Sequence, residues 1–369
     1  MSRPRYTPLV DSLPSTVPFV GPETQERGRG SRFRARLGAN ESVFGPSPKA
    51  IQAMADAASD TWMYGDPENY DLKQALAKHY NIGPENIVVG EGIDGLFGYL
   101  ARMLVSDSTP VVTSLGAYPT FNFHVSGFGG ELHMVPFTGD REDPAALLDK
   151  TKELAAPLIY FSNPNNPMGS WHSKETVQEL IDGIPEDGLL CLDEAYIEFA
   201  QEDIAPTIDV SNERVIRFRT FSKGYGMAGA RVGYGIASEE LITAFNKIRN
   251  HFGMTRVSQA GALAALADQD YLQDVKEKVW ASCAKIAAIA IDNGLTPLPT
   301  ATNFVTIDCG KDGEYAKKVV AELVARDVFV RMPFVEPQNR CIRVSAGKDK
   351  DLEILAAELP KALEAAMRS

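Results

Sequence analysis

One short segment of this sequence combines a lysine, two hydroxyl residues, an arginine and several glycines. It reads TFSKGYGMAGARVGYG over residues 220–235, and Lys223 follows a predicted strand. A lysine on its own is usually a solvated surface residue. A lysine that is partly desolvated holds a neutral, nucleophilic amine, so Lys223 could form an imine with a carbonyl compound. Thr220 and Ser222 could then donate hydrogen bonds to a phosphate, and Arg231 could bind that phosphate through two parallel hydrogen bonds.

The same segment contains a competing pattern, because Gly224, Gly226 and Gly229 spell GxGxxG. This pattern indicates dinucleotide binding only where a helix follows it and an acidic residue stands about 20 positions later. Here a second strand-like run, VGYGI, follows almost at once, and no strand that ends in an acid lies at the required distance. The sequence therefore favours the imine-forming lysine over a nicotinamide site.

A second segment places an aspartate at the end of an apolar run. It reads LLCLDEAYIEF over residues 189–199 and contains Asp193 and Tyr196. Taken alone, Asp193 is typical of a helix N-cap. A buried carboxylate is costly unless it is paired, so Asp193 could instead hold a pyridine nitrogen in its protonated form. Tyr196 could then donate a hydrogen bond to the phenolic oxygen of the same ring.

Two further segments offer polar groups beside predicted strands. SNPNNPMG (162–169) has the composition of a turn, yet the Asn166 amide could also donate to a ring oxygen. VVGEGIDGLF joins a strand to a predicted helix, where the backbone N–H groups at Ile93 and Asp94 could bind phosphate.

Three other residues are candidates on weaker grounds. Arg343 lies inside the apolar strand-like run CIRVSAG, where it needs an anionic partner, either a structural carboxylate or that of a substrate. Arg331, in VFVRMP, is a second candidate of the same kind. Phe121, in YPTF, could stack on a cofactor ring, although isolated aromatic residues usually belong to the core.

Composition excludes several classes of function. The chain has 369 residues, enough for two ordinary domains, and a formal net charge of −12, which disfavours nucleic acid and anionic membranes as partners. No apolar run is long enough to span a membrane, and no secretory signal is expected. The four cysteines form no CxxC unit, and the five histidines show no metal-ligand spacing. We therefore expect reduced thiols, no metal and a cytoplasmic location.

The chemical segments lie in a pattern that alternates helices with short apolar strands, which predicts an α/β fold. The predicted strands of the first sheet are residues 87–89, 110–113, 157–161, 188–192, 215–219 and 232–236. The last two are too close for a helical crossover and should pair as antiparallel neighbours. A long helical region is expected over 241–293. We expect an extended N-terminal arm (1–45) that joins the small domain, a large domain (46–265) and a small C-terminal α+β domain (266–369).

Taken together, these segments resemble the fold-type I pyridoxal-phosphate aminotransferases (class I and II), and among them the histidinol-phosphate aminotransferase group. The shared stretches are LGANESVFGPSP, WMYGDPENYDLKQALAKHY, NPNNPMG, DEAYIEF and TFSKGYGMAGARVGY, in that group's order and spacing. The resemblance implies an aspartate-aminotransferase-like fold, whose large domain has a mostly parallel seven-stranded sheet flanked by helices. It departs at Phe19, where that group usually has a tyrosine that meets the substrate phosphate.

The resemblance also implies roles for individual residues around pyridoxal 5′-phosphate. Lys223 would carry the cofactor as a Schiff base, and Asp193 would pair with the pyridinium nitrogen. The remaining cofactor contacts would come from Asn166, Tyr196, Phe121, Ile93, Asp94, Thr220, Ser222, Arg231 and, from the other subunit of a homodimer with a shared active site, Tyr64. The substrate side would be formed by Arg343, Arg331, Asn166, Ala39 and Phe19.

The expected reaction is transfer of an amino group between an amino acid or amine, histidinol-phosphate-like or related, and a 2-oxo acid, for which we expect 2-oxoglutarate. Lys223 would act as the general base at Cα. A decarboxylase of the threonine-phosphate decarboxylase type is the alternative on the same scaffold, since the sequence does not fix which Cα bond is aligned with the ring. A non-catalytic ligand-sensing module would need a DNA-binding domain before Ala39, for which the short arm leaves no room.

Overall fold

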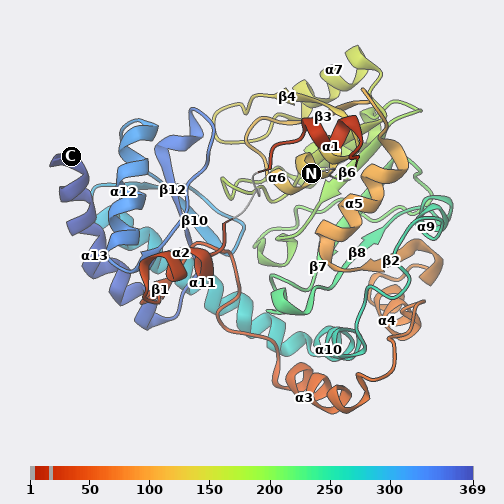
Figure 1. Cartoon of the computed structure of the whole chain (residues 1–369), viewed down its shortest axis with the longest axis horizontal. Coiled ribbons are helices and arrows are strands. Elements are labelled where there is room, and N and C mark those ends of the chain that lie inside the picture. Colours follow the sequence, from red (N-terminus) through yellow and green to blue (C-terminus); the bar gives the residue numbers. More distant parts are fainter. Residues whose placement is uncertain (1–4, 16–19, 369) are drawn as a thin grey trace.

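The computed structural model describes residues 5–15 and 20–368 of the chain. Figure 1 shows a large part built on a seven-stranded sheet and a smaller part that carries the C-terminus. Helix α11 (Gln269–Asp292) runs from the large part into the smaller one. No helix in the two described ranges has both the length and the apolar character needed to cross a membrane.

The large sheet is mostly parallel. Its strands are β2 (Ile87–Gly90), β3 (Pro110–Ser114), β4 (Glu131–Val135), β5 (Leu158–Ser162), β6 (Leu189–Asp193), β7 (Val215–Thr220) and β8 (Gly233–Ile236). Their spatial order is β2-β8-β7-β6-β5-β3-β4, and β8 alone runs antiparallel to its neighbours. Every residue of β5 and β6 is buried, as the apolar runs predict for inner strands. The α/β class, the mostly parallel sheet and the antiparallel pairing of β7 with β8 are confirmed.

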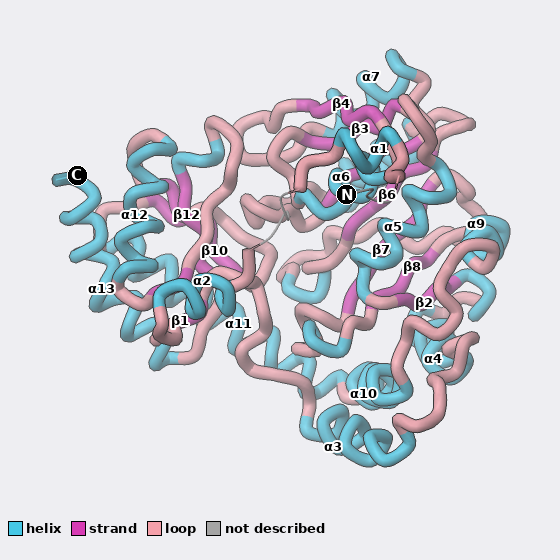
Figure 2. The backbone as a smooth tube through the Cα atoms, viewed as in Figure 1, coloured by secondary structure: helices cyan, strands magenta, loops and turns pink. Residues whose placement is uncertain are grey.

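Helices cover both faces of this sheet (Figure 2). They are α3 (Pro48–Ala57), α4 (Tyr70–Tyr80), α5 (Gly92–Leu104), α6 (Pro119–Gly127), α7 (Pro144–Leu154), α8 (Lys174–Gly183), α9 (Glu239–Phe245) and α10 (Arg256–Ala267). Alternate strand residues serve opposite faces: Tyr160 and Cys191 pack in one core with α5, whereas Ile159 and Leu190 pack in another with α7 and α8. The helical region expected over 241–293 is divided, with non-helical backbone between α9 and α10.

The smaller part has its own antiparallel sheet, in which β10 (Phe304–Asp308) lies between β9 (Thr296–Pro297) and β12 (Cys341–Ser345). Helices α11, α12 (Gly313–Ala325) and α13 (Asp349–Arg368) pack against it in one apolar core. From the N-terminal arm, β1 (Ala35–Arg36) pairs in parallel with β11 (Val328–Phe329). The arm therefore lies against the smaller part, while the domain boundaries at 45/46 and 265/266 stay predictions.

The N-terminal arm is less extended than expected. It contains two short helices, α1 (Pro8–Ser12) and α2 (Pro22–Arg29), each with a proline in its first turn. Arg29 pairs with Asp327 beside β11, and Arg34 pairs with Glu358 of α13 at 3.0 Å. The expectation of an extended arm was wrong at these two helices, each of which begins with a proline. The arginines of the arm pair with acids far along the chain, and sequence periodicity does not detect such pairs.

Candidate active site

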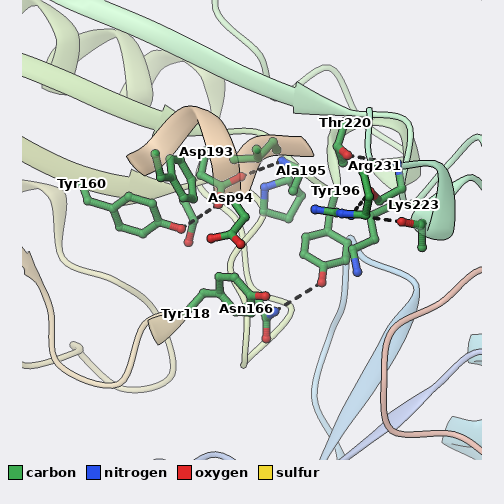
Figure 3. A pocket seen from close by; sticks show the side chains of 16 residues that line it. Asp94, Tyr118, Tyr160, Asn166, Asp193, Ala195, Tyr196, Thr220, Lys223 and Arg231 are labelled. Carbon is green, nitrogen blue, oxygen red and sulfur yellow. Dashed lines mark hydrogen bonds between the residues drawn. The ribbon is translucent and has the colours of Figure 1, made fainter. Parts of the chain in front are cut away.

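Most of the predicted cofactor residues converge on one cavity at the carboxyl ends of β5, β6 and β7 (Figure 3). This is the edge of a parallel sheet at which α/β proteins bind ligands. The cavity is lined by Ile93, Asp94, Phe97, Tyr118, Tyr160, Ser162, Pro164, Asn166, Asp193, Ala195, Tyr196, Thr220, Ser222, Lys223, Ala228 and Arg231.

Lys223 lies in the turn after β7, and its amine points into the cavity. The Nζ donates to the carbonyl oxygen of Asn40 at 3.0 Å and lies 5.4 Å from the centroid of the Tyr196 ring. Burial lowers the pKa of Lys223 from its usual value. No carboxylate forms an ion pair with this amine among the described residues, so part of it can be neutral and nucleophilic.

Asp193 is the last residue of β6 and is only 6% exposed. Its Oδ2 accepts from the Tyr160 hydroxyl at 2.7 Å, and its Oδ1 accepts from the Ala195 backbone N–H at 2.9 Å. Burial raises the pKa of Asp193 to about 6, although both hydrogen bonds lower it. Asp193 is not the N-cap of an α-helix. Only a short 3₁₀ helix (Ile197–Phe199) follows it, and the N-cap of that helix is Tyr196. The hydrogen-bond donors to Asp193 are neutral, so a cationic ring nitrogen would complete its environment.

Asn166 and Tyr196 contact each other beside Lys223. The Asn166 Nδ2 donates to the Tyr196 hydroxyl at 3.3 Å, and its Oδ1 accepts from the Arg343 guanidinium. Asn40 also donates to the Tyr196 hydroxyl, at 3.0 Å. Burial raises the pKa of Tyr196 to about 12, so the phenol stays protonated and can donate to a ligand oxygen.

Sequence reasoning missed Asn40, although it named the neighbouring Ala39. Asn40 is buried at φ 54° and contacts Lys223, Tyr196 and Ser345. A non-glycine residue in the left-handed region is often asparagine, but nothing in the local sequence identifies those three partners. Ala39 itself is half-buried and is not among the residues that line the cavity.

The opposite end of the cavity is suited to a phosphate. Helix α5 begins there, and no side chain caps its first N–H groups, which include those of Ile93 and Asp94. The Arg231 guanidinium lies 3.5 Å from the Ser222 hydroxyl and 3.4 Å from the Glu91 carbonyl oxygen. Thr220 Oγ1 accepts from the Ser222 N–H at 3.0 Å, which fixes the turn. The Thr220 hydroxyl itself donates to the Val232 carbonyl oxygen at 3.2 Å, so the groups left around one position are the Arg231 cation, the Ser222 hydroxyl and the first N–H groups of α5.

The predicted substrate arginines come from the smaller part. Arg343 lies in β12 and, besides Asn166, donates to the Gly38 carbonyl oxygen at 3.3 Å, so its partners in the described chain are neutral. Burial lowers the pKa of Arg343 to about 10. Arg331 pairs with Arg343 through the backbone, and both line a second hollow together with Tyr118 and Asn166. Phe19 lies outside the described residues.

Two predicted cofactor residues lie elsewhere. Phe121 does not line the cavity: it is fully buried in the core, stacked on Tyr160 at 4.7 Å and edge-on to Phe97 at 5.7 Å. Tyr118, which precedes α6, is the aromatic residue of that segment at the cavity, so the assignment of Phe121 was wrong. Tyr64 is 77% exposed and packs against Phe252, away from the cavity of its own chain.

These residues fit pyridoxal phosphate. The buried Asp193 with neutral donors suits a pyridinium nitrogen, and the uncapped start of α5 beside Arg231 suits the phosphate. A Cβ on Gly92 would lie 2.3 Å from Arg231 Nη2, and one on Gly233 would lie 2.6 Å from the Gly92 carbonyl carbon. Glycine at both positions lets Arg231 and the α5 backbone approach closely enough to share an anion.

Comparison with known proteins agrees with this chemistry. The sequence profile of the family described as Aminotransferase class I and II matches residues 35–359. Histidinol-phosphate aminotransferase 2 from Carboxydothermus hydrogenoformans is 32% identical over 359 residues, covering 96% of this chain and 98% of that protein.

Solved structures give the same result. The crystal structure of histidinol-phosphate aminotransferase from Sinorhizobium meliloti in complex with pyridoxal-5′-phosphate has a TM-score of 0.96 and 52% identity, covering 99% of both chains. An aspartate aminotransferase from Thermus thermophilus has a TM-score of 0.82 at 18% identity, covering 98% of this chain and 100% of that one, which indicates a common fold. The predicted aspartate-aminotransferase-like fold is confirmed.

Proposed function

Because this chain belongs to the class I and II aminotransferase family and is a pyridoxal-phosphate-dependent aminotransferase, we propose that its amino donor is a phosphorylated amine of the histidinol-phosphate type. We propose 2-oxoglutarate as the acceptor. The observation that carries the proposal is the cavity that holds Lys223 and Asp193, joined through Asn166 to the neighbouring hollow that holds Arg343. The identity with histidinol-phosphate aminotransferases over almost the whole chain supports the choice of donor.

In the proposed mechanism Lys223 holds the cofactor and later moves a proton. When bound, pyridoxal phosphate supplies an aldehyde carbon that condenses with amines and a ring that accepts electrons. When it is not bonded to the cofactor, the Lys223 Nζ would act as the general base that removes the proton from the substrate Cα. Asp193 would keep the ring nitrogen protonated, and the Tyr196 hydroxyl, which accepts from Asn166, would donate to the ring oxygen.

Arg343 binds and orients the substrate. Its guanidinium is held by Asn166 and Gly38, so it is fixed before an anion arrives. Arg331 lines the neighbouring hollow and offers a second guanidinium for a doubly charged or phosphorylated substrate. Holding the substrate at one end fixes its Cα near Lys223, which is a contribution of proximity.

We further propose that the working unit is a homodimer in the cytoplasm. The exposed Tyr64 side chain of one subunit would reach the cofactor phosphate of the other. The four cysteines are free and buried in the structure, which supports a reducing location.

A visible spectrum of the cofactor-loaded protein tests the proposed function. L-glutamate should bleach the absorption band of the bound cofactor, and 2-oxoglutarate should restore it. L-histidinol phosphate should then bleach the band at far lower concentrations than unphosphorylated L-histidinol. Equal responses to the two donors would refute the proposed donor, and carbon dioxide release without amino exchange would contradict transamination itself.

The phosphate end of the site can be tested at Gly92. Gly92 has φ 80°, and a Cβ there would lie 2.3 Å from Arg231 Nη2. Gly92→Ala should therefore weaken binding of pyridoxal phosphate to the apoprotein by roughly tenfold, since an L residue in this conformation costs about 1–2 kcal/mol and Arg231 must move. Titration of the apoprotein by absorbance measures the affinity.

Gly95→Ala is the matched control in the same helix. Its nearest atom would be Glu91 Oε2 at 3.3 Å, and its backbone is not in the left-handed region. This variant should keep the wild-type affinity, because alanine is a better helix former than glycine. Equal affinities of the Gly92→Ala variant and the wild type would show that the phosphate does not bind at the start of α5.

A further inference from the structure

Glu142 is a buried carboxylate that the catalytic scheme does not use. It lies between β4 and α7 and is 1% exposed. Its side chain has no cationic partner among the described residues, and its bonds come from Ser114, Ser162 and Asn165, all of them buried. Burial raises its pKa, although these hydrogen bonds lower it. Burying a carboxyl group costs more free energy than burying an apolar residue of similar size. We therefore expect Glu142 to have a specific role in this structure.

The hydrogen bonds of Glu142 are directed at the loop that carries Asn166. Oε2 accepts from Ser114 Oγ at 2.6 Å, and Oε1 accepts from Ser162 Oγ at 2.5 Å and from Asn165 Nδ2 at 2.7 Å. The carbonyl oxygen of the same residue accepts from His172 Nε2 at 2.8 Å. Glu142 therefore holds both ends of the loop between β5 and α8.

The hydrogen bonds of Asn165 also fix the position of the adjacent Asn166. The Asn165 Nδ2 is bound to Glu142, and the Asn165 Oδ1 accepts from the Met168 N–H at 3.0 Å. Its backbone N–H donates to the Ser170 carbonyl oxygen at 2.8 Å. With Asn165 fixed on three sides, the adjacent Asn166 points its Nδ2 at the Tyr196 hydroxyl (Figure 3). Its Oδ1 accepts from the Arg343 guanidinium.

We propose that Glu142 is a positioning residue for the reaction: it fixes the 163–170 loop so that Asn166 can hold Tyr196 at the cofactor and Arg343 at the substrate. The inference rests on the proposed roles of Asn166 and Arg343. It names a residue that touches neither cofactor nor substrate and lies outside the segments that suggest chemistry in the sequence.

The donor pattern decides which substitution should be tolerated. The Asn165 Nδ2 group can only donate, so the group at the Oε1 position must be an acceptor. The Ser114 hydroxyl can either donate or accept, so the group at the Oε2 position can also be a donor. Glutamine meets both conditions with its oxygen toward Asn165 and its amide toward Ser114. Alanine meets neither and leaves buried donors without partners.

The test compares Glu142→Ala with Glu142→Gln in the full-length protein. Amide hydrogen exchange over residues 165–170 reports on the loop with or without cofactor and needs no substrate. The half-saturating concentration of L-glutamate for bleaching of the cofactor band reports on Arg343. Glu142→Ala should speed amide exchange in the loop by roughly tenfold, because buried hydrogen-bond donors are left unpaired. For the same reason, it should raise the half-saturating concentration of L-glutamate by roughly tenfold. Glu142→Gln should match the wild type in both measurements.

Asp143→Ala is the control for general destabilisation. Asp143 is the next residue, and its carboxylate caps α7 by accepting from the Ala146 N–H at 3.0 Å. This variant should lower the melting temperature without altering loop exchange or the glutamate response. Should Glu142→Ala fail to fold, Ser114→Ala removes one donor to Glu142 and should give smaller changes in the same two measurements.

Either of two results would overturn the proposal: wild-type loop exchange in the Glu142→Ala variant, or equal loss in the alanine and glutamine variants. Loop exchange separates this inference from the proposed function. A wild-type protein that responds to glutamate but does not prefer histidinol phosphate would refute the donor alone, while the exchange result would still decide the role of Glu142.

Discussion

Replacing Lys223 by alanine should lower the rate of transamination by about 10⁴-fold, at the upper end of what a positioned general base contributes. Lys223 provides the amine that the proposed scheme uses twice, first to hold the cofactor and then to remove the Cα proton. No other lysine or histidine lines the cavity in the described part of the chain, so no second amine or imidazole is placed to take over the proton transfer. The variant should still bind pyridoxal phosphate through the phosphate end of the site.

The measurement is the visible spectrum and the rate of band bleaching with L-glutamate. The Lys223→Ala protein should bind the cofactor with a shifted band, and mass spectrometry after borohydride reduction should find no cofactor on the chain. Lys174→Ala is the control, since Lys174 forms an exposed ion pair with Asp203, a kind of contact worth little. Wild-type bleaching by the Lys223→Ala variant would mean that another group carries the proton.

Short segments of the sequence were sufficient to find Lys223, Asp193 and Asn166, which the structure gathers at the cavity. Lys223, Asp193 and Asn166 each lie at or just after the end of a predicted strand, and these strands are parallel and end at one edge of the sheet. Strand prediction therefore also predicts that these side chains meet. Their roles at the cofactor stay proposals.

The sequence could not predict the positions of residues that depend on helix orientation or on contacts distant along the chain. Tyr118 and Phe121 are three residues apart, and only the start of α6 at Pro119 determines which of them faces the cavity. Asn40 and Glu142 act through partners far along the chain, such as Ser345 and Asn165. No local pattern marks such contacts, because they exist only after the sheet and its loops have formed.

The strands of the large sheet show the same difference between features that local sequence predicts and features that depend on a partner. Inner strands such as β5 and β6 were predicted from their continuous apolar runs. The edge strand β4 was not predicted. In β4, Glu131 and Met134 are exposed and only Val135 is buried, so it lacks the continuous apolar run of an inner strand. Pairing with β3 on one side makes it a strand, and that information lies in the partner.

Asp193→Asn should reduce transamination by roughly 10²- to 10³-fold, similar to the loss of one preorganised electrostatic contact at a reacting centre. Asparagine can keep the geometry, with its oxygen toward the Ala195 N–H and its amide toward the Tyr160 hydroxyl, which can also accept. What it cannot supply is the negative charge that keeps the ring nitrogen protonated. The rate of band bleaching by glutamate measures the loss, and near-wild-type rates would show that this charge is not needed.

The same substitution has a second, opposite effect on the stability of the apoprotein. Burial raises the pKa of Asp193 from an ordinary 3.8 to about 6, so the protonated form is favoured by folding. The stabilisation that this proton provides is present below pH 4 and is lost as the pH rises through about 6, and the shift corresponds to about 3 kcal/mol. Relative to Asp193→Asn, the wild-type apoprotein should therefore lose up to about that free energy of unfolding between pH 4 and pH 7.

Urea denaturation of both apoproteins at several pH values measures this difference. Pyridoxal phosphate should remove most of it at pH 7, because a cationic ring nitrogen stabilises the ionised carboxylate. A difference that does not vary with pH would show that Asp193 has an ordinary pKa in the folded chain. A difference that the cofactor leaves unchanged would place the ring nitrogen elsewhere. Asp193 thus lowers the stability of the apoprotein at the pH where its charge is needed, and binding of the cofactor offsets that cost.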